Sequence, residues 1–282
     1  MNGNSENKKR ILIIGEDSYV GENAAEYLRE LGGYEVALID ARGLKCTPEI
    51  FIGYDVVLNV AGIAHVKETR KNRELFYKVN RDLASEAADA AKSAGVGQFI
   101  TMSSMSVYGR TSGVIGRDTV PKPTGAYGVS KLQADEHILS LASEDFKPVC
   151  LRPPMIYGKG CKGNYQRIRS FTLKFPVFPK YRNERSVIYI GNLCEFIRAV
   201  IEEEREGVFI PQNAEYINTS ELVGLIAEAN GKKMRFTGIF NPAISLLKIG
   251  TVKKVFGTLT YEKLDTVDKY SLRESVFLTE KQ

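Results

Sequence analysis

The chain has 282 residues, of which 43% are hydrophobic and 26% charged, and its formal net charge is +5. This length allows a large buried core, and the composition is ordinary for a globular protein. No run approaches the ~20 apolar residues that a membrane-spanning helix needs. The polar residues 1–10 predict neither a secretory signal nor an anchor. We therefore expect a cytoplasmic protein without stable membrane insertion.

The cysteines, histidines and charges argue against several further classes of protein. Cys46, Cys150, Cys161 and Cys194 form no CxxC pair, which indicates reduced thiols and neither a disulfide framework nor a zinc site. With only two histidines, we expect no metal centre. Lysines and arginines are spread along the chain among 34 acidic residues. The mild positive charge therefore does not predict nucleic-acid binding, and it suits an enzyme with phosphate-bearing ligands.

Short apolar runs alternate with helical patterns through the first half of the chain. The runs predict strands at residues 9–15, 34–40, 55–60, 97–103 and 148–152. Helices are predicted at 19–31, 73–94 and 127–141, the second of them marked by Leu75, Val79, Leu83 and Ala87 at four-residue spacing. Strands that alternate with helices imply a parallel sheet covered on both faces. We therefore predict an α/β fold with a Rossmann-like, doubly wound parallel sheet.

A glycine turn follows the first predicted strand. Gly15 and Gly21 flank Ser18, Tyr19 and Val20, where the next helix begins. Free N–H groups at a helix start attract an anion, so this turn can bind a pyrophosphate, although an ordinary turn can look the same.

An acidic residue ends the second predicted strand. The carboxylate of Asp40 can accept both ribose hydroxyls of NAD and would repel the 2′-phosphate of NADP. Arg42 lies close by and could accept that phosphate instead. We favour NAD over NADP as the cofactor.

Small residues and a tyrosine–lysine pair follow later strands. Val60, Ala61 and Gly62 leave room for a ligand at the end of the third strand. Tyr127 and Lys131 are four residues apart, so they share one face of a helix. An ammonium beside a phenol favours the phenolate, so we expect Lys131 to lower the pKa of Tyr127. Tyr127 would then act as an acid and base near neutral pH.

These motifs together resemble the extended branch of the short-chain dehydrogenase/reductases, the NAD-dependent epimerase/dehydratase family. They comprise the glycine turn, Asp40, VAG at 60–62, SSMSVYG at 103–109, the Tyr127–Lys131 pair and RPPMIYG at 152–158. The resemblance covers nearly the whole chain and departs at Ser18, where the family has glycine. It implies that Ser104, Tyr127 and Lys131 are catalytic, with Ser103 as the alternative serine, and that Asn80 and Pro153 adjoin the cofactor.

The resemblance also implies a substrate and a division of the chain. We expect a dinucleotide-binding domain at residues 1–155, to which residues near 186–211 return, and a smaller, mainly substrate-binding α/β region at 156–282. Asn164 and Arg185 match positions that hold the diphosphate of a nucleotide-diphospho-sugar, and residues 176–180 match a loop that packs on uracil or thymine. Ser104 and Tyr127 would face the sugar hydroxyl.

The sequence also suggests a helix cap, a position for a basic stretch and an oligomeric state. A helix is expected at 220–229, capped by Thr219 or Ser220. The basic stretch 241–257 can lie on a membrane or pack on the small domain, and packing is favoured. The family resemblance also allows a homodimer through helices 73–94 and 127–141.

Three functions are compatible with these residues. The family's 4,6-dehydratases carry Thr-Asp-Glu where this chain has Ser104, Met105 and Ser106, which argues against dehydration. A UDP-hexose or UDP-N-acetylhexosamine 4-epimerase that regenerates its NAD leads, because Asp40 favours NAD. An NAD(P)H-dependent 4-keto-sugar reductase is the alternative, favoured by the short chain. A non-catalytic dinucleotide sensor is the third, and it would not need the Tyr127–Lys131 pair.

Overall fold

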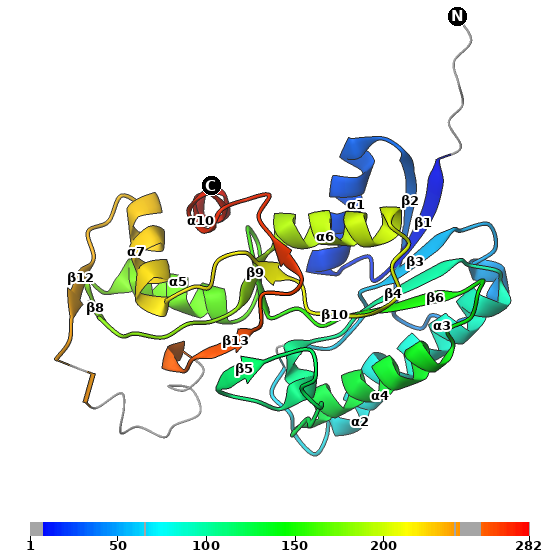
Figure 1. Ribbon diagram of the computed structural model, residues 1–282, viewed down its shortest axis with the longest axis horizontal. Coiled ribbons are helices and arrows are strands. Elements are labelled where there is room, and N and C mark those ends of the chain that lie inside the picture. Colours follow the sequence, from blue (N-terminus) through cyan, green and yellow to red (C-terminus); the bar gives the residue numbers. More distant parts are fainter. Residues whose placement is uncertain (1–7, 65, 240, 243–254, 282) are drawn as a thin grey trace, which may run out of the picture. The chain divides into compact units, whose positions relative to one another are not determined.

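The computed structural model describes residues 8–64, 66–239, 241–242 and 255–281 (Figure 1). The chain divides into two compact units. The first contains Met1–Gly109, Pro121–Arg152 and Cys194–Ile210, and the second Arg110–Val120, Pro153–Leu193 and Pro211–Gln282. None of the helices in these described ranges is long and apolar enough to span a bilayer. Most of the basic stretch 241–257 lies outside the described residues, so its placement stays a prediction.

The first unit is built on a six-stranded sheet in which every strand pair is parallel. The strand order is β10-β6-β4-β3-β1-β2. The strands are β1 (Lys9–Ile14), β2 (Tyr34–Ile39), β3 (Val56–Asn59), β4 (Gln98–Met102), β6 (Lys147–Leu151) and β10 (Gly207–Phe209). The central strands are buried continuous apolar runs, as expected of a parallel sheet covered on both faces. The predicted α/β fold with a parallel sheet is confirmed.

The strand order creates a switch point beside β1. The chain runs from β1 outward to β2 and then returns to the other side of β1 as β3. In open parallel sheets, ligands bind at the carboxyl ends of the strands where the order reverses. The residues after β1 and β3 therefore adjoin the expected crevice. An ideal Cβ placed on Gly15 would lie 3.2 Å from the Ala61 nitrogen, which shows how close the two strand ends are.

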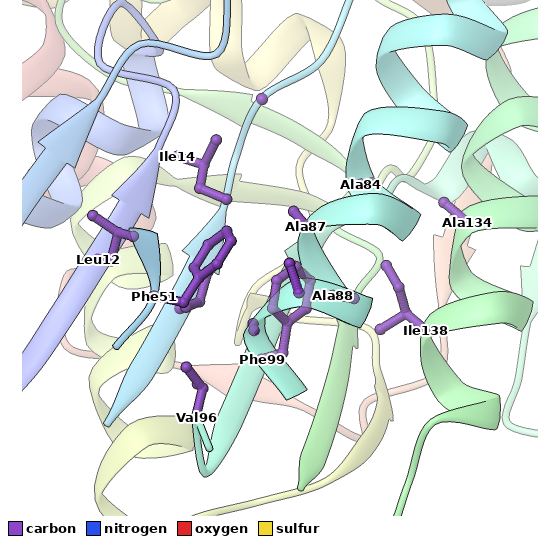
Figure 2. Close-up of a cluster of buried hydrophobic side chains, with 14 of the residues drawn as sticks. Leu12, Ile14, Phe51, Ala84, Ala87, Ala88, Val96, Phe99, Ala134 and Ile138 are labelled. Atoms are coloured by element: carbon purple, nitrogen blue, oxygen red, sulfur yellow. The ribbon is translucent and has the colours of Figure 1, made fainter. Parts of the chain in front are cut away.

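Helices cover both faces of this sheet (Figure 1). Helices α1 (Tyr19–Leu31) and α6 (Ile190–Glu202) lie on one face, and α3 (Leu83–Ser93) and α4 (Ala126–Ser140) on the other. The small alanines of α3 let it approach the sheet closely. Between β2 and β3 there is only a 3-10 turn, η1 (Pro48–Ile50), and the buried ring of Phe51 fills the core that a crossover helix would fill (Figure 2).

The long helix predicted at 73–94 contains an irregular turn. Helix α2 (Arg73–Tyr77) passes through a π-helical turn, η2 (Lys78–Asp82), into α3. The side chains buried before α3 are Phe76 and Asn80, whereas Leu75 is 47% exposed. Of the residues that marked the predicted helix, Leu83 and Ala87 contact the core, whereas Leu75 does not face it. π-turns are frequent at functional sites, and this one contains Asn80.

The described part of the second unit contains four two-stranded parallel sheets. They pair β5 (Gly113–Ile115) with β13 (Leu259–Tyr261), β7 (Met155–Tyr157) with β9 (Val187–Tyr189), β8 (Val177–Pro179) with β12 (Arg235–Thr237), and β11 (Gln212–Asn213) with β14 (Thr266–Val267). The helices with described bounds in this unit are α5 (Asn164–Lys174), α7 (Thr219–Ala229) and α10 (Leu272–Glu280).

The cap of α7 differs from the prediction. The side chain of Asn218 accepts from the N–H groups of Ser220 and Glu221 at 2.9 and 3.2 Å. The predicted cap at Thr219 or Ser220 was therefore wrong. The hydroxyl of Ser220 instead donates to the Pro179 carbonyl, at 2.9 Å.

The contact between α1 and the sheet gives a testable prediction. A Cβ on Gly21 would lie 2.7 Å from the Gly15 carbonyl oxygen and 3.0 Å from Cγ2 of Val60. We expect Gly21→Ala to destabilise the protein by about 1–3 kcal/mol through overpacking and to weaken dinucleotide binding. Gly33→Ala is the control, because nothing lies within 4 Å of its Cβ position. Urea unfolding of both variants measures the difference, and equal stability would contradict the packing argument.

Candidate active site

The glycine turn after β1 is held against β2 and opens α1. The N–H groups of Gly15 and Glu16 donate to the Ile39 carbonyl at 2.9 and 3.1 Å, and Gly15 has a φ of +116°. Ser18 has φ −83° and ψ 128°, so its backbone does not require the family's glycine. Its hydroxyl caps α1 by accepting from the Gly21 N–H at 3.5 Å. Tyr19 and Val20 are the first residues of the helix, whose N-terminus suits an anion.

Asp40 directly follows β2 and is tied to the same turn by an arginine. Its carboxylate accepts from the backbone N–H and Nε of Arg42, at 2.9 and 2.8 Å. These bonds hold the pKa of Asp40 below its usual value. Arg42 also pairs with Asp17 of the turn, 2.7 Å away. The carboxylate that we expect to favour NAD and the cation that could accept the 2′-phosphate of NADP therefore lie together.

The segment after β3 is held by Asn80. Val60 and Ala61 are buried. The side chain of Asn80, itself buried, accepts from the Ile63 N–H at 2.8 Å and donates to the Ile63 carbonyl at 3.2 Å. A Cβ on Gly62 would meet Oδ1 of Asn80 at 3.0 Å and Nζ of Lys131 at 3.1 Å. Only glycine leaves the backbone this close to the lysine.

Lys131 carries a buried ammonium. Its residue is 5% exposed, and Nζ donates to the Met102 carbonyl at the end of β4, at 2.7 Å. Burial lowers the pKa of Lys131 to about 8, and the negative charge of Asp135 opposes the shift. The amine therefore loses its proton as the pH rises through about 8, well below the ordinary lysine range.

Burial, rather than this lysine, determines the direction of the Tyr127 pKa. Burial raises the pKa of Tyr127, a hydrogen bond with Ser104 opposes the rise, and the charge of Asp135 adds to it. Our expectation that Lys131 lowers this pKa was therefore wrong. Loss of phenolate hydration dominates, and the ammonium of Lys131 is bonded to the Met102 carbonyl. The ring of Phe76 packs edge-on against Tyr127, with centroids 6.4 Å apart.

A buried ion pair lies one turn beyond Lys131 and had not been predicted. Asp135, 1% exposed, accepts through Oδ2 from Nε of Arg152 at 2.9 Å and from Oγ of Ser103 at 2.7 Å. Arg152 also donates to the Tyr108 hydroxyl at 3.2 Å. Because Ser103 is bonded to Asp135, Ser104 is the serine that meets Tyr127. The eight-residue spacing from Tyr127, which repeats one helix face, was the available signal.

The other expected site residues lie in the second unit. Pro153 is buried and lies two residues after the end of β6, where the chain enters the second unit. Asn164 is the first residue of α5, after Gly163 with φ 95°. Arg185 is half-buried and donates to the Gly257 carbonyl at 2.9 Å. Burial lowers the pKa of Arg185. Within the described ranges, Arg185 pairs with no carboxylate.

The parallel sheet, its switch point and the glycine turn define a Rossmann-type α/β protein. The model of the NAD dependent epimerase/dehydratase family matches residues 11–210, and the chain therefore belongs to this family. The expected family and the expectation of an enzyme are confirmed.

Two curated relatives extend the comparison. The chain is 26% identical to the UDP-glucose 4-epimerase of Vibrio cholerae, across 95% of this chain and 87% of the relative. It is 25% identical to the N-acetyl-alpha-D-glucosaminyl-diphospho-ditrans,octacis-undecaprenol 4-epimerase of Escherichia coli O157:H7, across 79% of this chain and 73% of the relative.

Solved structures share the fold. UDP-glucuronic acid 4-epimerase from Bacillus cereus, in complex with NAD, matches with a TM-score of 0.77 at 17% identity and covers 96% of this chain and 97% of its own. The dTDP-4-dehydrorhamnose reductase of Bacillus anthracis, in complex with NADP, matches with a TM-score of 0.69 at 20% identity, with 81% and 83% covered. The similar proteins thus include both epimerases and reductases, with either dinucleotide.

The buried ion pair yields the second prediction. Asp135→Asn leaves Arg152 buried without its counter-charge, and we expect a loss of about 3–5 kcal/mol in unfolding free energy. It also removes the charge that raises the pKa of Lys131, so the alkaline limit of activity should move to lower pH. Asp89→Asn is the control, because Asp89 pairs with His137 at the surface, and such pairs contribute about 1 kcal/mol or less. Equal losses in urea unfolding would contradict the account.

Proposed function

We propose that the protein is an NAD-dependent 4-epimerase of nucleotide-diphospho-sugars, with a UDP-hexose or UDP-N-acetylhexosamine as substrate. One observation carries this proposal. The Tyr127 phenol, hydrogen-bonded to Ser104, and the Lys131 ammonium, against Gly62, lie on elements that meet at the carboxyl ends of β3 and β4. The similarity to a UDP-glucose 4-epimerase over 95% of the chain supports this assignment.

The residues around the switch point fit a nicotinamide dinucleotide. The α1 N-terminus, with Gly15 and Ser18, would hold the pyrophosphate, and Gly62 leaves space where a Cβ would collide with Lys131. Asp40 would accept the adenosine ribose hydroxyls, which favours NAD over NADP. Bound NAD would supply the hydride acceptor for carbon 4 of the sugar and the donor for its return.

The side chains of this protein would move the proton. Ser104 and Tyr127 would hydrogen-bond the C4 oxygen, and Tyr127 would take its proton as the ketone forms and return it afterwards. Lys131 would hold a positive charge beside Gly62 at the same strand ends, although burial determines the direction of the Tyr127 pKa. No carboxylate stands at Met105 or Ser106, so the site lacks the second acid/base pair that dehydration of the sugar would need.

The second unit would hold the diphosphate. Arg185 is a half-buried cation that donates to the Gly257 carbonyl, and a guanidinium recognises phosphate through a fork of donors. Asn164 stands at the start of α5, where helix N–H groups also favour an anion. We place the reaction in the cytoplasm, because all four cysteines are free. A homodimer through α2–α3 and α4 stays a prediction.

A 4-keto-sugar reductase is the second candidate. The raised pKa keeps Tyr127 protonated, and a neutral phenol is the form that protonates the oxygen of a ketone during reduction. In this reaction NAD(P)H would supply the hydride and leave oxidised. Ser104, Tyr127 and Lys131 would have the same positions in both reactions.

Product analysis separates the two candidates. Purified protein is incubated with a trace of NAD and individual UDP-hexoses or UDP-N-acetylhexosamines. We expect an isomeric sugar in many-fold excess over the cofactor, because an epimerase regenerates its NAD. No product from any of these sugars, with dinucleotide binding intact, would overturn the epimerase proposal in favour of the reductase.

Removal of the Tyr127 hydroxyl should stop turnover and leave dinucleotide binding intact. We expect Tyr127→Phe to lower kcat by about 10²–10⁴-fold, the typical contribution of a positioned acid/base. Dinucleotide affinity should change little, since the ring is retained. Tyr77→Phe on α2 is the control and should retain full activity. Steady-state kinetics and dinucleotide titration provide the readouts, and an active Tyr127→Phe protein would refute the proposed role.

The Asp40 carboxylate should determine dinucleotide preference. Asp40→Ala removes the ribose acceptor and frees Arg42 from one of its two acidic partners. We expect NAD affinity to fall about 10-fold, as for a lost charged hydrogen bond, while NADP affinity holds or improves. Titration calorimetry with both dinucleotides measures the change. An equal loss for both would show that Asp40 does not face the ribose.

A further inference from the structure

The first turn of α4 carries Tyr127 but receives its cap from a distant part of the chain. The residue before the helix is Gly125, which has no side chain to cap it, and the first turn contains no Asp or Glu. Oε2 of Glu68, in the segment after β3, accepts from the backbone N–H of Ala126 at 2.8 Å. The residue bonded to this carboxylate is therefore the one directly before Tyr127.

Gly125 makes room for this carboxylate. Its φ of −136° and ψ of 164° are extended backbone that any residue can adopt, so its conformation does not require glycine. A Cβ on Gly125 would lie 3.2 Å from Oε2 of Glu68, a close contact for a carbon atom. The start of a helix favours a negative charge, because its free N–H groups point outward. The missing side chain of Gly125 and the carboxylate of Glu68 therefore form one capping arrangement.

The segment that carries Glu68 is itself ordered by hydrogen bonds. The side chain of Asn72 accepts from the Thr69 N–H at 2.7 Å and donates to the Lys67 carbonyl at 3.0 Å. Nε of Arg73, at the start of α2, lies 3.7 Å from Oε1 of Glu68. One carboxylate oxygen of Glu68 thus faces Arg73, and the other is left to bond α4.

The same segment begins at the strand end where we place the dinucleotide. A Cβ on Gly62 would meet Nζ of Lys131 at 3.1 Å. After β3 the chain therefore approaches α4 twice, first at Lys131 and then, through Glu68, at Ala126. Tyr127 lies between these two points of α4. The contacts that place the loop beside the dinucleotide are thus the contacts that flank the phenol.

We propose that Glu68 is a positioning residue for Tyr127. Its carboxylate connects the loop after β3 to the residue before Tyr127, and in this way it fixes the phenol relative to the dinucleotide held by that loop. Glu68 acts through the helix and not on the sugar, and the inference rests on the proposed role of Tyr127 in proton transfer. Because a small misplacement of a reacting group costs much of the rate, loss of this connection slows the chemical step and leaves binding unchanged.

Kinetics of Glu68 variants test the proposal on the full chain. Glu68→Ala removes the acceptor, and we expect kcat to fall about tenfold or more, while KM and dinucleotide affinity hold. Glu68→Gln keeps an oxygen at the same reach and should recover most of the turnover. Glu74→Ala on α2 removes another exposed glutamate and should turn over as the unaltered protein does. Unchanged kcat in Glu68→Ala would overturn the proposal.

A second substitution separates positioning from helix stability. Gly125→Ser gives α4 a cap of its own, and in the Glu68→Ala background the added side chain meets no carboxylate. We expect Glu68→Ala/Gly125→Ser to regain the urea midpoint of the unaltered protein and yet to stay slow, because the loop is still separated from the helix. Recovery of full kcat would show that Glu68 only stabilises the helix, and the proposal would fail.

Amide hydrogen exchange, followed by NMR, measures the Glu68 contact without any substrate. We expect the Ala126 N–H to exchange about tenfold faster in Glu68→Ala than in the unaltered protein, since it loses its acceptor. Unchanged exchange would overturn the proposal even in an active epimerase. Failure of the epimerase proposal has a different signature. The unaltered protein would then form no isomeric sugar, while exchange at Ala126 would still be faster in Glu68→Ala.

Discussion

A buried ammonium sets the arrangement of the first unit. Lys131 is removed from water, and its main compensation is the Met102 carbonyl at the end of β4. The carboxylate of Asp135, one helical turn away, supplies the opposite charge and is itself paired with Arg152. Charged side chains on one face of α4 therefore connect this helix to the end of β4, through Lys131, and to the residue after β6, through the Asp135–Arg152 ion pair. Gly62 is required where it stands because a Cβ would meet this ammonium. The position of the phenol of Tyr127 follows from the same helix face.

The strands and the switch point could be predicted from sequence because they depend on local patterns. Apolar runs such as ILII in β1 end at glycine or asparagine, and α1 begins at residue 19 as expected. The predictions that were wrong concern properties that depend on the tertiary surroundings of a residue. The pKa of Tyr127 is raised because its burial outweighs a lysine that is bonded elsewhere. At the start of the long helix, Phe76 is buried and Leu75 is exposed, and a π-turn at 78–82, which propensity does not reveal, separates them from the regular helix that follows.

In the candidate site, too, the residues that could be predicted are those with a local sequence pattern. Tyr127 and Lys131 stand out in sequence because an i, i+4 pair has a chemical meaning on any helix. Asp135 does not, because an acidic residue on a helix is usually solvated, and only the packing of β6 brings Arg152 to it. The family resemblance favours Ser104 over the adjacent Ser103, and the hydrogen bond of Ser103 to Asp135 gives a physical reason for that choice. In the second unit, the short strands and the basic loop carry weak periodicity, so Arg185 and Asn164 rest on family resemblance and on their own surroundings.

The central claim is that carbon 4 of the sugar exchanges a hydride with the nicotinamide while Tyr127 moves only the hydroxyl proton. Epimerisation in D₂O tests it most directly, with NMR of the isomeric product at C4. A hydride held on the cofactor does not exchange with solvent, so the account predicts a product without deuterium at that carbon. Deuterium at C4 would mean that a base removes the carbon-bound proton, and that result would contradict the mechanism.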